Sequence, residues 1–139
     1  MIFGIVLGAV IALCIAVIVA IARDRGPGPG EVAVSYEYAW DRLDFDALWT
    51  LSAKELRDGL DRRQFVATKR VAYEQQPALR GLVAHVALDS VTVTANGEVA
   101  QVTTRVELHD HTTVHNLVQL VCDVLGQHEV IPGGAGFDP

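Results

Sequence analysis

The densest group of possible metal ligands in the sequence is His109-Asp110-His111, with His115 four residues later. Imidazole nitrogens bind zinc and similar metals, and a neighbouring carboxylate can orient a ligating imidazole. His109 and His111 could approach one ion if the chain curves between them. A polar loop between two strands has the same composition without a metal, and this interpretation is favoured. We expect no cofactor, and His109 and His111 remain the metal candidates.

Thr104 and Asn116 are the polar residues that the strand pattern places on an otherwise apolar face of a sheet. Unpaired polar groups in such a place cost about 1–3 kcal/mol each. The two side chains can bond to each other, to a buried water or to a bound molecule, and the structural pair is favoured. If the domain has a cavity, we expect it to be lined by Thr104, Asn116, Tyr38 and Trp40.

Acid–base catalysis would need a carboxylate or a histidine held inside the domain, with a pKa shifted by burial. No such group falls on an inward strand position in the expected register, although His85 and Asp89 would if the strand irregularity lay elsewhere. Walker, dinucleotide-binding, zinc-finger and G-x-S-x-G motifs are absent. We therefore assign no catalytic residue and favour a non-catalytic domain over an enzyme.

The elements that must position these residues begin with helices. Helical spacing predicts a first helix of about three turns from Glu31, with an apolar stripe formed by Val32, Tyr36, Ala39, Trp40 and Leu43. Asp44 is placed to cap a second, short helix. Ser52-Ala53-Lys54-Glu55 fits a capping box and predicts a third helix that ends near Gly59. Asp61 can cap a further helix through Arg62 to Gln76.

Strands follow, because apolar residues then recur at every second position. Asn96-Gly97 predicts a two-residue type I′ turn, with a bulge near Asp89-Ser90 and the pairs Val93 with Ala100 and Val91 with Val102. A three-residue loop, His109-Asp110-His111, places Leu108 opposite Thr112. Further pairs follow from this register, among them Val106 with Val114, Thr104 with Asn116, Val102 with Val118, and Ala100 with Leu120. A last strand is expected over Gln127 to Ile131.

Helices that precede antiparallel strands predict an α+β domain in which a curved sheet is covered on its inner face. The stretch from Tyr36 to Trp49, YEYAWDRLDFDALW, resembles the opening of nuclear transport factor 2-like (SnoaL-like) domains. The later strand, Asn-Gly turn and strand match that layout over residues 31–131. The resemblance implies a cone that is either a pocket or a filled core. Such domains often have a Trp near the start of the last strand, where this chain has His128-Glu129-Val130.

Residues 1–22 form an uncharged apolar run long enough to cross a bilayer as a helix, with lipid-facing candidates Ile2, Leu7, Leu13, Ile18 and Ile21. A transmembrane anchor is favoured over a cleaved signal peptide or a core helix, because no basic residue precedes the run and no polar face interrupts it. Arg23 and Arg25 follow, which favours a cytoplasmic domain. The resemblance extends to small bacterial membrane proteins of unassigned role with such an anchor.

The domain organisation that follows is a transmembrane helix (1–22), a Gly/Pro linker (23–30), the α+β domain (31–131) and a disordered tail (132–139). The net charge of −6 argues against nucleic acid as a partner. The leading hypothesis is a membrane-anchored interaction module, which touches lipid through residues 1–22 and a partner or second copy through the outer sheet face near Leu117 and Val121. The alternative is a tethered small-molecule-binding cone or isomerase-like enzyme.

Overall fold

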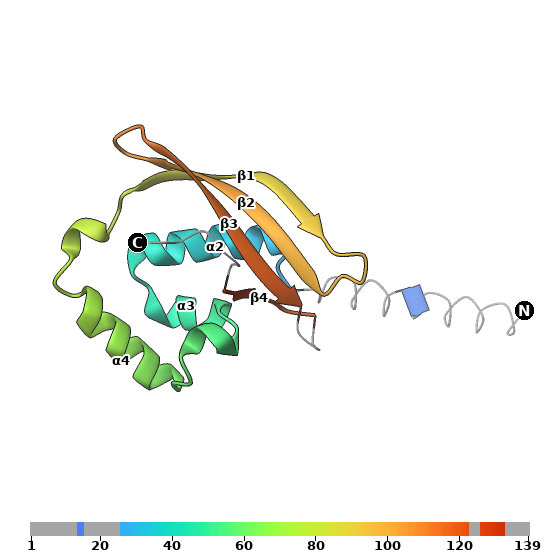
Figure 1. The fold of residues 1–139 in the computed structure, drawn as a ribbon, viewed down its shortest axis with the longest axis horizontal. Coiled ribbons are helices and arrows are strands. Elements are labelled where there is room, and N and C mark those ends of the chain that lie inside the picture. The colour runs from blue at the N-terminus through green and yellow to red at the C-terminus, as the bar shows by residue number, and fades with distance from the viewer. Residues whose placement is uncertain (1–13, 16–25, 123–125, 133–139) are drawn as a thin grey trace, which may run out of the picture.

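The computed structural model describes residues 14–15, 26–122 and 126–132, and in these the helices precede an antiparallel sheet, as expected for an α+β domain (Figure 1). The sheet has the order β1-β2-β3-β4 and curls over helix α2. The helical elements are α2 (Pro29–Arg42), α3 (Phe45–Leu51), η1 (Lys54–Arg57), α4 (Arg62–Tyr73) and η2 (Pro77–Leu79). The strands are β1 (Val83–Val93), β2 (Val99–Leu108), β3 (Thr113–Cys122) and β4 (His128–Ile131).

The first helix of the domain, α2, begins at Pro29, two residues before the predicted start. Proline is favoured in the first helical turn, because its missing N–H has no helical partner there in any case. The Glu31 side chain then reaches back and accepts a hydrogen bond from the Gly28 N–H at 3.2 Å. The last two residues of the expected Gly/Pro linker, Pro29 and Gly30, therefore belong to helix α2.

Two predicted aspartate caps are confirmed. Asp44 Oδ1 accepts from the Ala47 N–H at 3.0 Å at the start of α3, and Asp61 Oδ1 accepts from the Gln64 N–H at 2.9 Å at the start of α4. The Gln64 side-chain oxygen in turn accepts a hydrogen bond from the Asp61 N–H, which completes a capping box. Helix α4 ends at Tyr73, three residues before the predicted end.

The predicted capping box at Ser52 is wrong. Ser52 ends α3 instead, in extended conformation and only 3% exposed. It forms an isolated parallel bridge with Val130 of β4, and the Ala53 N–H donates to the Val130 carbonyl at 2.8 Å. This long-range pairing holds the backbone extended where the motif needs a helix start, so only the short 3₁₀ helix η1 follows.

The predicted strand register is confirmed by every pair given above, including Thr104 with Asn116 and the bulge between Leu88 and Ser90. The turn type is wrong. Among the described residues, Gly97 has a positive φ of 75° and Asn96 does not. The Gly97 N–H bonds to the Thr94 carbonyl, and the Asn96 side chain accepts from the Thr94 hydroxyl. The Asn96 side chain thus stabilises a wider turn than the two-residue one.

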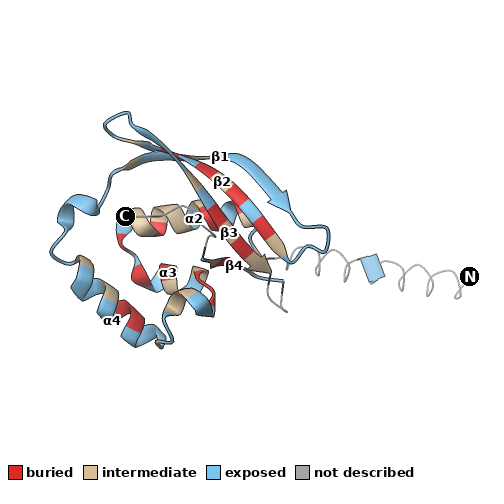
Figure 2. Cartoon of the chain, viewed as in Figure 1, coloured by how far each residue is buried: buried red, intermediate tan, exposed pale blue. Residues whose placement is uncertain are grey.

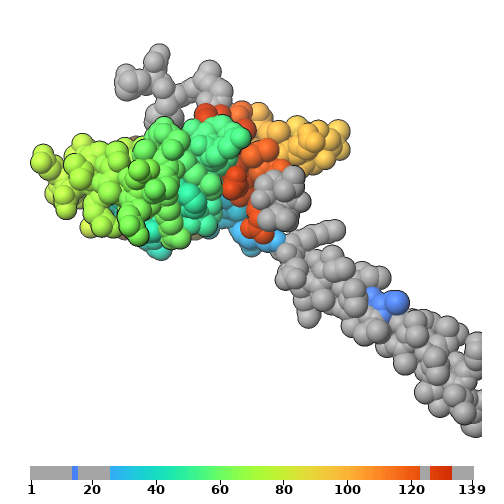
Figure 3. All heavy atoms as spheres, turned by 90° about the horizontal axis from the view of Figure 1, so that it is seen from below, coloured from blue at the N-terminus to red at the C-terminus, as the bar shows by residue number. Residues whose placement is uncertain are grey.

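The core lies between α2 and the inner face of β2 and β3 (Figure 2). Val102 and Leu120 of the sheet are fully buried there against Val32 and Ala33 of α2. A second cluster, around Leu48, joins the end of α2 to α3 and α4. The space-filling view shows the helices α3 and α4 gathered at one end of the domain and the β1–β2 hairpin projecting at the other (Figure 3).

No helix within residues 14–15, 26–122 and 126–132 is long and apolar enough to cross a membrane. All but two residues of the expected anchor at 1–22, including Ile2, Leu7, Leu13, Ile18 and Ile21, lie outside the described residues, as does most of the expected tail.

Candidate functional site

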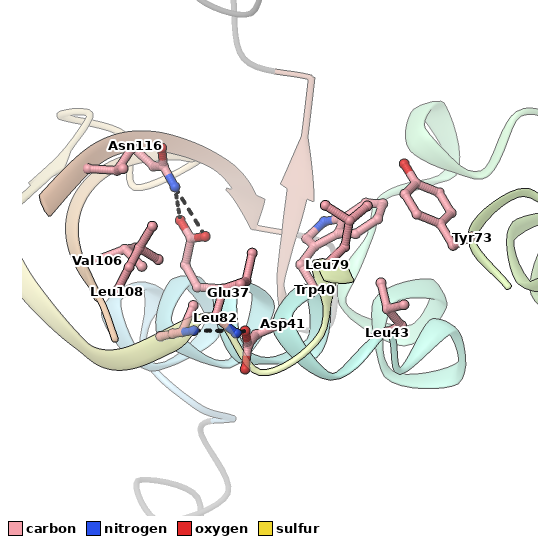
Figure 4. Close-up of a pocket in the computed structure, with 12 residues that line it drawn as sticks. Glu37, Trp40, Asp41, Leu43, Tyr73, Leu79, Leu82, Val106, Leu108 and Asn116 are labelled. Atoms are coloured by element: carbon pink, nitrogen blue, oxygen red, sulfur yellow. Dashed lines mark hydrogen bonds between the residues drawn. The ribbon is translucent and has the colours of Figure 1, made fainter. Parts of the chain in front are cut away.

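A cavity of about 330 Å³ lies between helix α2, the 3₁₀ helix η2 and the end of the sheet where β2 meets β3 (Figure 4). Its wall is mainly apolar and aromatic, with a few polar side chains. The lining residues are Glu37, Trp40, Asp41, Leu43, Tyr73, Leu79, Leu82, Val83, Val106, Leu108, Val114 and Asn116.

Helix α2 supplies the polar part of this wall. Glu37, Trp40 and Asp41 are spaced by three and four residues, so they share one face of the helix. In Figure 4 the Glu37 carboxylate points up toward Asn116 of β3, whereas Asp41 points toward the chain at Leu82. Both carboxylates therefore belong to the cavity wall, but they have different surroundings.

Glu37 is held by two side chains from adjacent strands. The Thr104 hydroxyl donates to Glu37 Oε1 at 2.8 Å, and the Asn116 amide donates to Oε1 at 3.0 Å and to Oε2 at 3.2 Å. Thr104 is fully buried and Asn116 is half-buried. The predicted cross-strand neighbours thus both point at a carboxylate, and this arrangement fixes the orientation of that carboxylate.

The donors that hold Glu37 are uncharged. Among the described residues, the lysine, arginine and histidine side chains that pair with carboxylates do so with other acidic residues, and none lies within 4.0 Å of Glu37. Asp41 Oδ1 accepts from the backbone N–H groups of Leu82 and Val83 at 2.7 and 2.9 Å. Asp41 thereby fastens the start of β1 to α2. The described residues that line the cavity include two acidic side chains and no basic one.

Aromatic rings form the other end of the cavity. Trp40 meets Tyr73 edge-to-face at a centroid distance of 5.7 Å, and it meets Tyr36 and Phe45 in the same way at 6.4 Å. Burial raises the pKa of the Tyr36 phenol, and the nearby charge of Glu37 acts in the same direction, while a hydrogen bond with Trp40 opposes it. The rings are packed against one another, so the aromatic end of the cavity is held by mutual contacts.

Of the four residues expected to line a cavity, Trp40 and Asn116 lie on its wall. Thr104 is not among the residues that line the cavity. Its hydroxyl donates to the carboxylate of Glu37, which does line it. Tyr38 is on another side of α2. Its hydroxyl accepts from the Val86 N–H at 3.2 Å, and the Arg42 guanidinium lies 5.7 Å from its ring. Tyr38 therefore fastens α2 to β1.

The histidine-rich segment forms the loop between β2 and β3. His109 and His111 are exposed, and Asp110 Oδ1 accepts from the Thr112 N–H at 2.8 Å. Hydrogen bonds from Thr112 lower the pKa of the Asp110 carboxyl. Asp110 thus stabilises the turn, and the described part of the chain holds no group of three or more candidate metal ligands.

Other polar residues that the sequence analysis considered, His115 and Asp89, lie on the outer face of the sheet. His115 Nδ1 lies 2.9 Å from Asp89 Oδ2, and Arg105 approaches the other oxygen of Asp89 at 3.6 Å. Neither His85 nor Asp89 reaches the inner face. Leu117 is exposed on the outer face as expected, at 52%, but Val121 is half-buried because β4 pairs alongside it.

Sequence reasoning missed Glu37, because it looked for a buried acid on the strands. A signal was nevertheless present: two polar residues on an apolar sheet face, Thr104 and Asn116, both have donors that need an acceptor. The helix predicted to cover that face has Glu37 next to its apolar stripe. Combining the two observations would have indicated the contact.

No family model matches the sequence, and no curated protein matches it. Among solved structures, a crystal structure of a Campylobacter jejuni protein called an NTF2-like transpeptidase matches with a TM-score of 0.52. The match covers 77% of this chain and 100% of that chain, at 13% sequence identity. The fold is NTF2-like. At this identity the likeness extends to the NTF2-like architecture alone, and the cavity lies between the helices and the curved sheet of that architecture.

Proposed function

We propose that the NTF2-like domain binds a small, mainly apolar organic molecule in the cavity beside Glu37. The observation that carries the proposal is a pocket of about 330 Å³, open to solvent, between helix α2, η2 and the sheet. Ligand sites in proteins have volumes of about 300–1,000 Å³ and combine apolar walls with a few convergent polar groups. Glu37 and Asn116 are such groups here.

The contacts of Glu37 support this choice over an interaction module with a filled cone. Donors from two strands hold the Glu37 carboxylate in one orientation. A ligand site gains affinity when its acceptor oxygens are oriented before the ligand binds. The apolar residues around it, such as Leu82, Val106 and Val114, supply the area that a ligand can cover. The proposal concerns binding, and we assign no catalytic residue.

We further propose that residues 1–22 hold this domain at the cell membrane as a single helix, with the domain on the cytoplasmic side. The support is the uncharged apolar run and the two arginines, Arg23 and Arg25, that follow it. The chain should stay with the membrane fraction after alkaline extraction. Protease treatment of intact cells should leave the domain uncut, and cleavage would place it outside.

Binding can be followed through Trp40, which lies on the cavity wall. The chain has two tryptophans, so Trp49→Phe leaves Trp40 as the single indole. We expect a panel of small apolar molecules, titrated into this variant of the full chain in lipid nanodiscs, to include members that change Trp40 fluorescence saturably.

A pair of further variants locates the binding. Val114→Phe adds volume on the cavity wall and should weaken binding, whereas Leu117→Phe makes a similar change on the outer face of the same strand and should leave it unchanged. The proposed function is wrong if no member of the panel binds, or if Val114→Phe and Leu117→Phe bind equally well.

A further inference from the structure

The cavity carries uncompensated negative charge. Glu37 is half-buried, and within the described part of the chain its hydrogen-bond donors are the neutral groups of Thr104 and Asn116. No cationic side chain of the described residues lies within 4.0 Å of it. A half-buried carboxylate with only neutral donors attracts opposite charge, so its surroundings are complementary to a positively charged group.

The second acidic side chain on the wall, Asp41, strengthens this preference. Its backbone donors, the N–H groups of Leu82 and Val83, are also neutral. A carboxylate-bearing ligand would meet two like charges, which disfavours anions in this cavity. A neutral ligand would leave Glu37 without a counter-charge.

An organic cation fits the rest of the wall better than a metal ion. A divalent cation needs several oxygen ligands, and no group of three or more candidate ligands occurs within the described ranges. Most of the wall is apolar, with Leu82, Val106 and Val114 among its residues. The rings of Trp40 and Tyr73 lie at the other end of the cavity, where they add apolar surface for the hydrocarbon part of an organic cation.

We infer that the ligand of this cavity is a small alkyl or arylalkyl amine in its protonated form, whose ammonium group bonds to the Glu37 carboxylate while its apolar part covers the opposite wall. This inference rests on the binding function proposed above. The ammonium supplies the cation that Glu37 lacks, and it can donate to Oε2, which receives one hydrogen bond where Oε1 receives two.

Matched probes test the inference in the full chain carrying Trp49→Phe, with Trp40 fluorescence as the readout. The probes are 2-phenylethylamine, its neutral analogue 2-phenylethanol and the anionic 3-phenylpropanoate. Both the alcohol and the amine can donate to the Glu37 carboxylate, but only the amine adds an opposite charge. A close charge pair is worth at least about 1.4 kcal/mol, so the amine should bind about tenfold more tightly than the alcohol. The carboxylate should bind more weakly than the alcohol.

Glu37→Gln should remove the preference for the amine while the alcohol still binds, which also shows that the variant cavity is intact. Glu107→Gln removes an equal charge from an exposed position on β2 and should keep the preference. Equal affinities for amine and alcohol in the parent chain, or a preference that survives Glu37→Gln, would overturn the inference and leave the binding function standing. If none of the three probes binds saturably while another member of the panel does, the inference fails and the binding function stands.

Discussion

Glu37 owes its place in the cavity to residues on two other elements. The Thr104 hydroxyl and the Asn116 amide lie side by side on neighbouring strands and both donate to its carboxylate. Each of the three groups would be an unsatisfied polar group on an apolar face without the others. Together they form a small polar site that can stay inside the domain.

Removing one donor tests how much this site contributes to stability. Thr104 is fully buried, so Thr104→Val keeps the shape of the side chain but leaves Glu37 with one donor fewer. Since hydrogen bonds to charged groups contribute about 1.5–3 kcal/mol, we expect a loss of about that size in the free energy of unfolding, measured in urea. Thr103→Val, on the outer face of the same strand, is the control, and equal losses in the two variants would contradict the assigned role of Thr104.

The half-buried phenol of Tyr36 predicts a loss of stability at alkaline pH. Burial raises its pKa in the folded chain above the ordinary value of 10.0. The folded state therefore holds this proton more tightly than the unfolded state, so the stabilisation is complete below pH 10.0 and is lost as the pH rises toward the folded pKa. Urea unfolding across this range should show a steeper decline for the parent chain than for Tyr36→Phe, and parallel curves would refute the prediction.

At the scale of elements, the shape of the cavity depends on how the two helices that line it, α2 and α4, are held in place. Helix α2 carries Glu37, Trp40 and Asp41, and Asp41 ties this helix to the first residues of β1. Helix α4 supplies Tyr73 from its last turn. Much of α4 is exposed, because among its residues only Phe65 and Val66 are buried. The stability of this helix, and with it the position of Tyr73, therefore depends on the Asp61 cap.

The Asp61 cap of α4 is therefore open to test. Replacing a capping aspartate by alanine costs about 0.5–2 kcal/mol, because a backbone N–H at the helix start loses its acceptor. Asp61→Ala should lower the free energy of unfolding by that amount, and Asp61→Ser, which keeps an acceptor, should be close to the parent chain. A serine variant as unstable as the alanine variant would show that the cap is not the cause.

At the scale of the whole molecule, the two faces of the sheet make different contacts. The inner face packs on α2 and ends in the cavity, while the outer face carries the Asp89, Arg105 and His115 contacts beside the exposed Leu117. We propose that a second copy of the chain docks on this outer face, where the large apolar side chain of Leu117 is 52% exposed.

Light scattering of the full chain in detergent tests the dimer. The parent chain should show twice the monomer mass, and Leu117→Glu should reduce it to one copy by placing a charge in the interface. Val71→Glu changes another exposed apolar side chain, on α4, and should leave the mass as in the parent chain. A monomeric parent chain would rule out docking of two copies on this face.

Local chemistry was enough to predict much of the fold. The alternation of apolar residues determined the register of β1, β2 and β3, because a shift by one residue would turn every apolar side chain of a strand to the other face. Asp44 and Asp61 likewise determined two helix starts, since a cap acts within one turn. The apolar run at residues 1–22 is a property of the sequence alone.

Tertiary structure decided what local patterns could not. Ser52 fits a capping box, yet its backbone pairs with Val130, far along the chain, and no local rule contains that contact. Glu37 is one acidic residue among 17 until α2 lies across the sheet and brings it to Thr104 and Asn116. The residues that line the cavity come from α2, α4, η2 and the sheet, so they meet only in the folded chain. Patterns along the chain determine which face of an element is apolar, whereas packing between distant elements determines where space and charge remain.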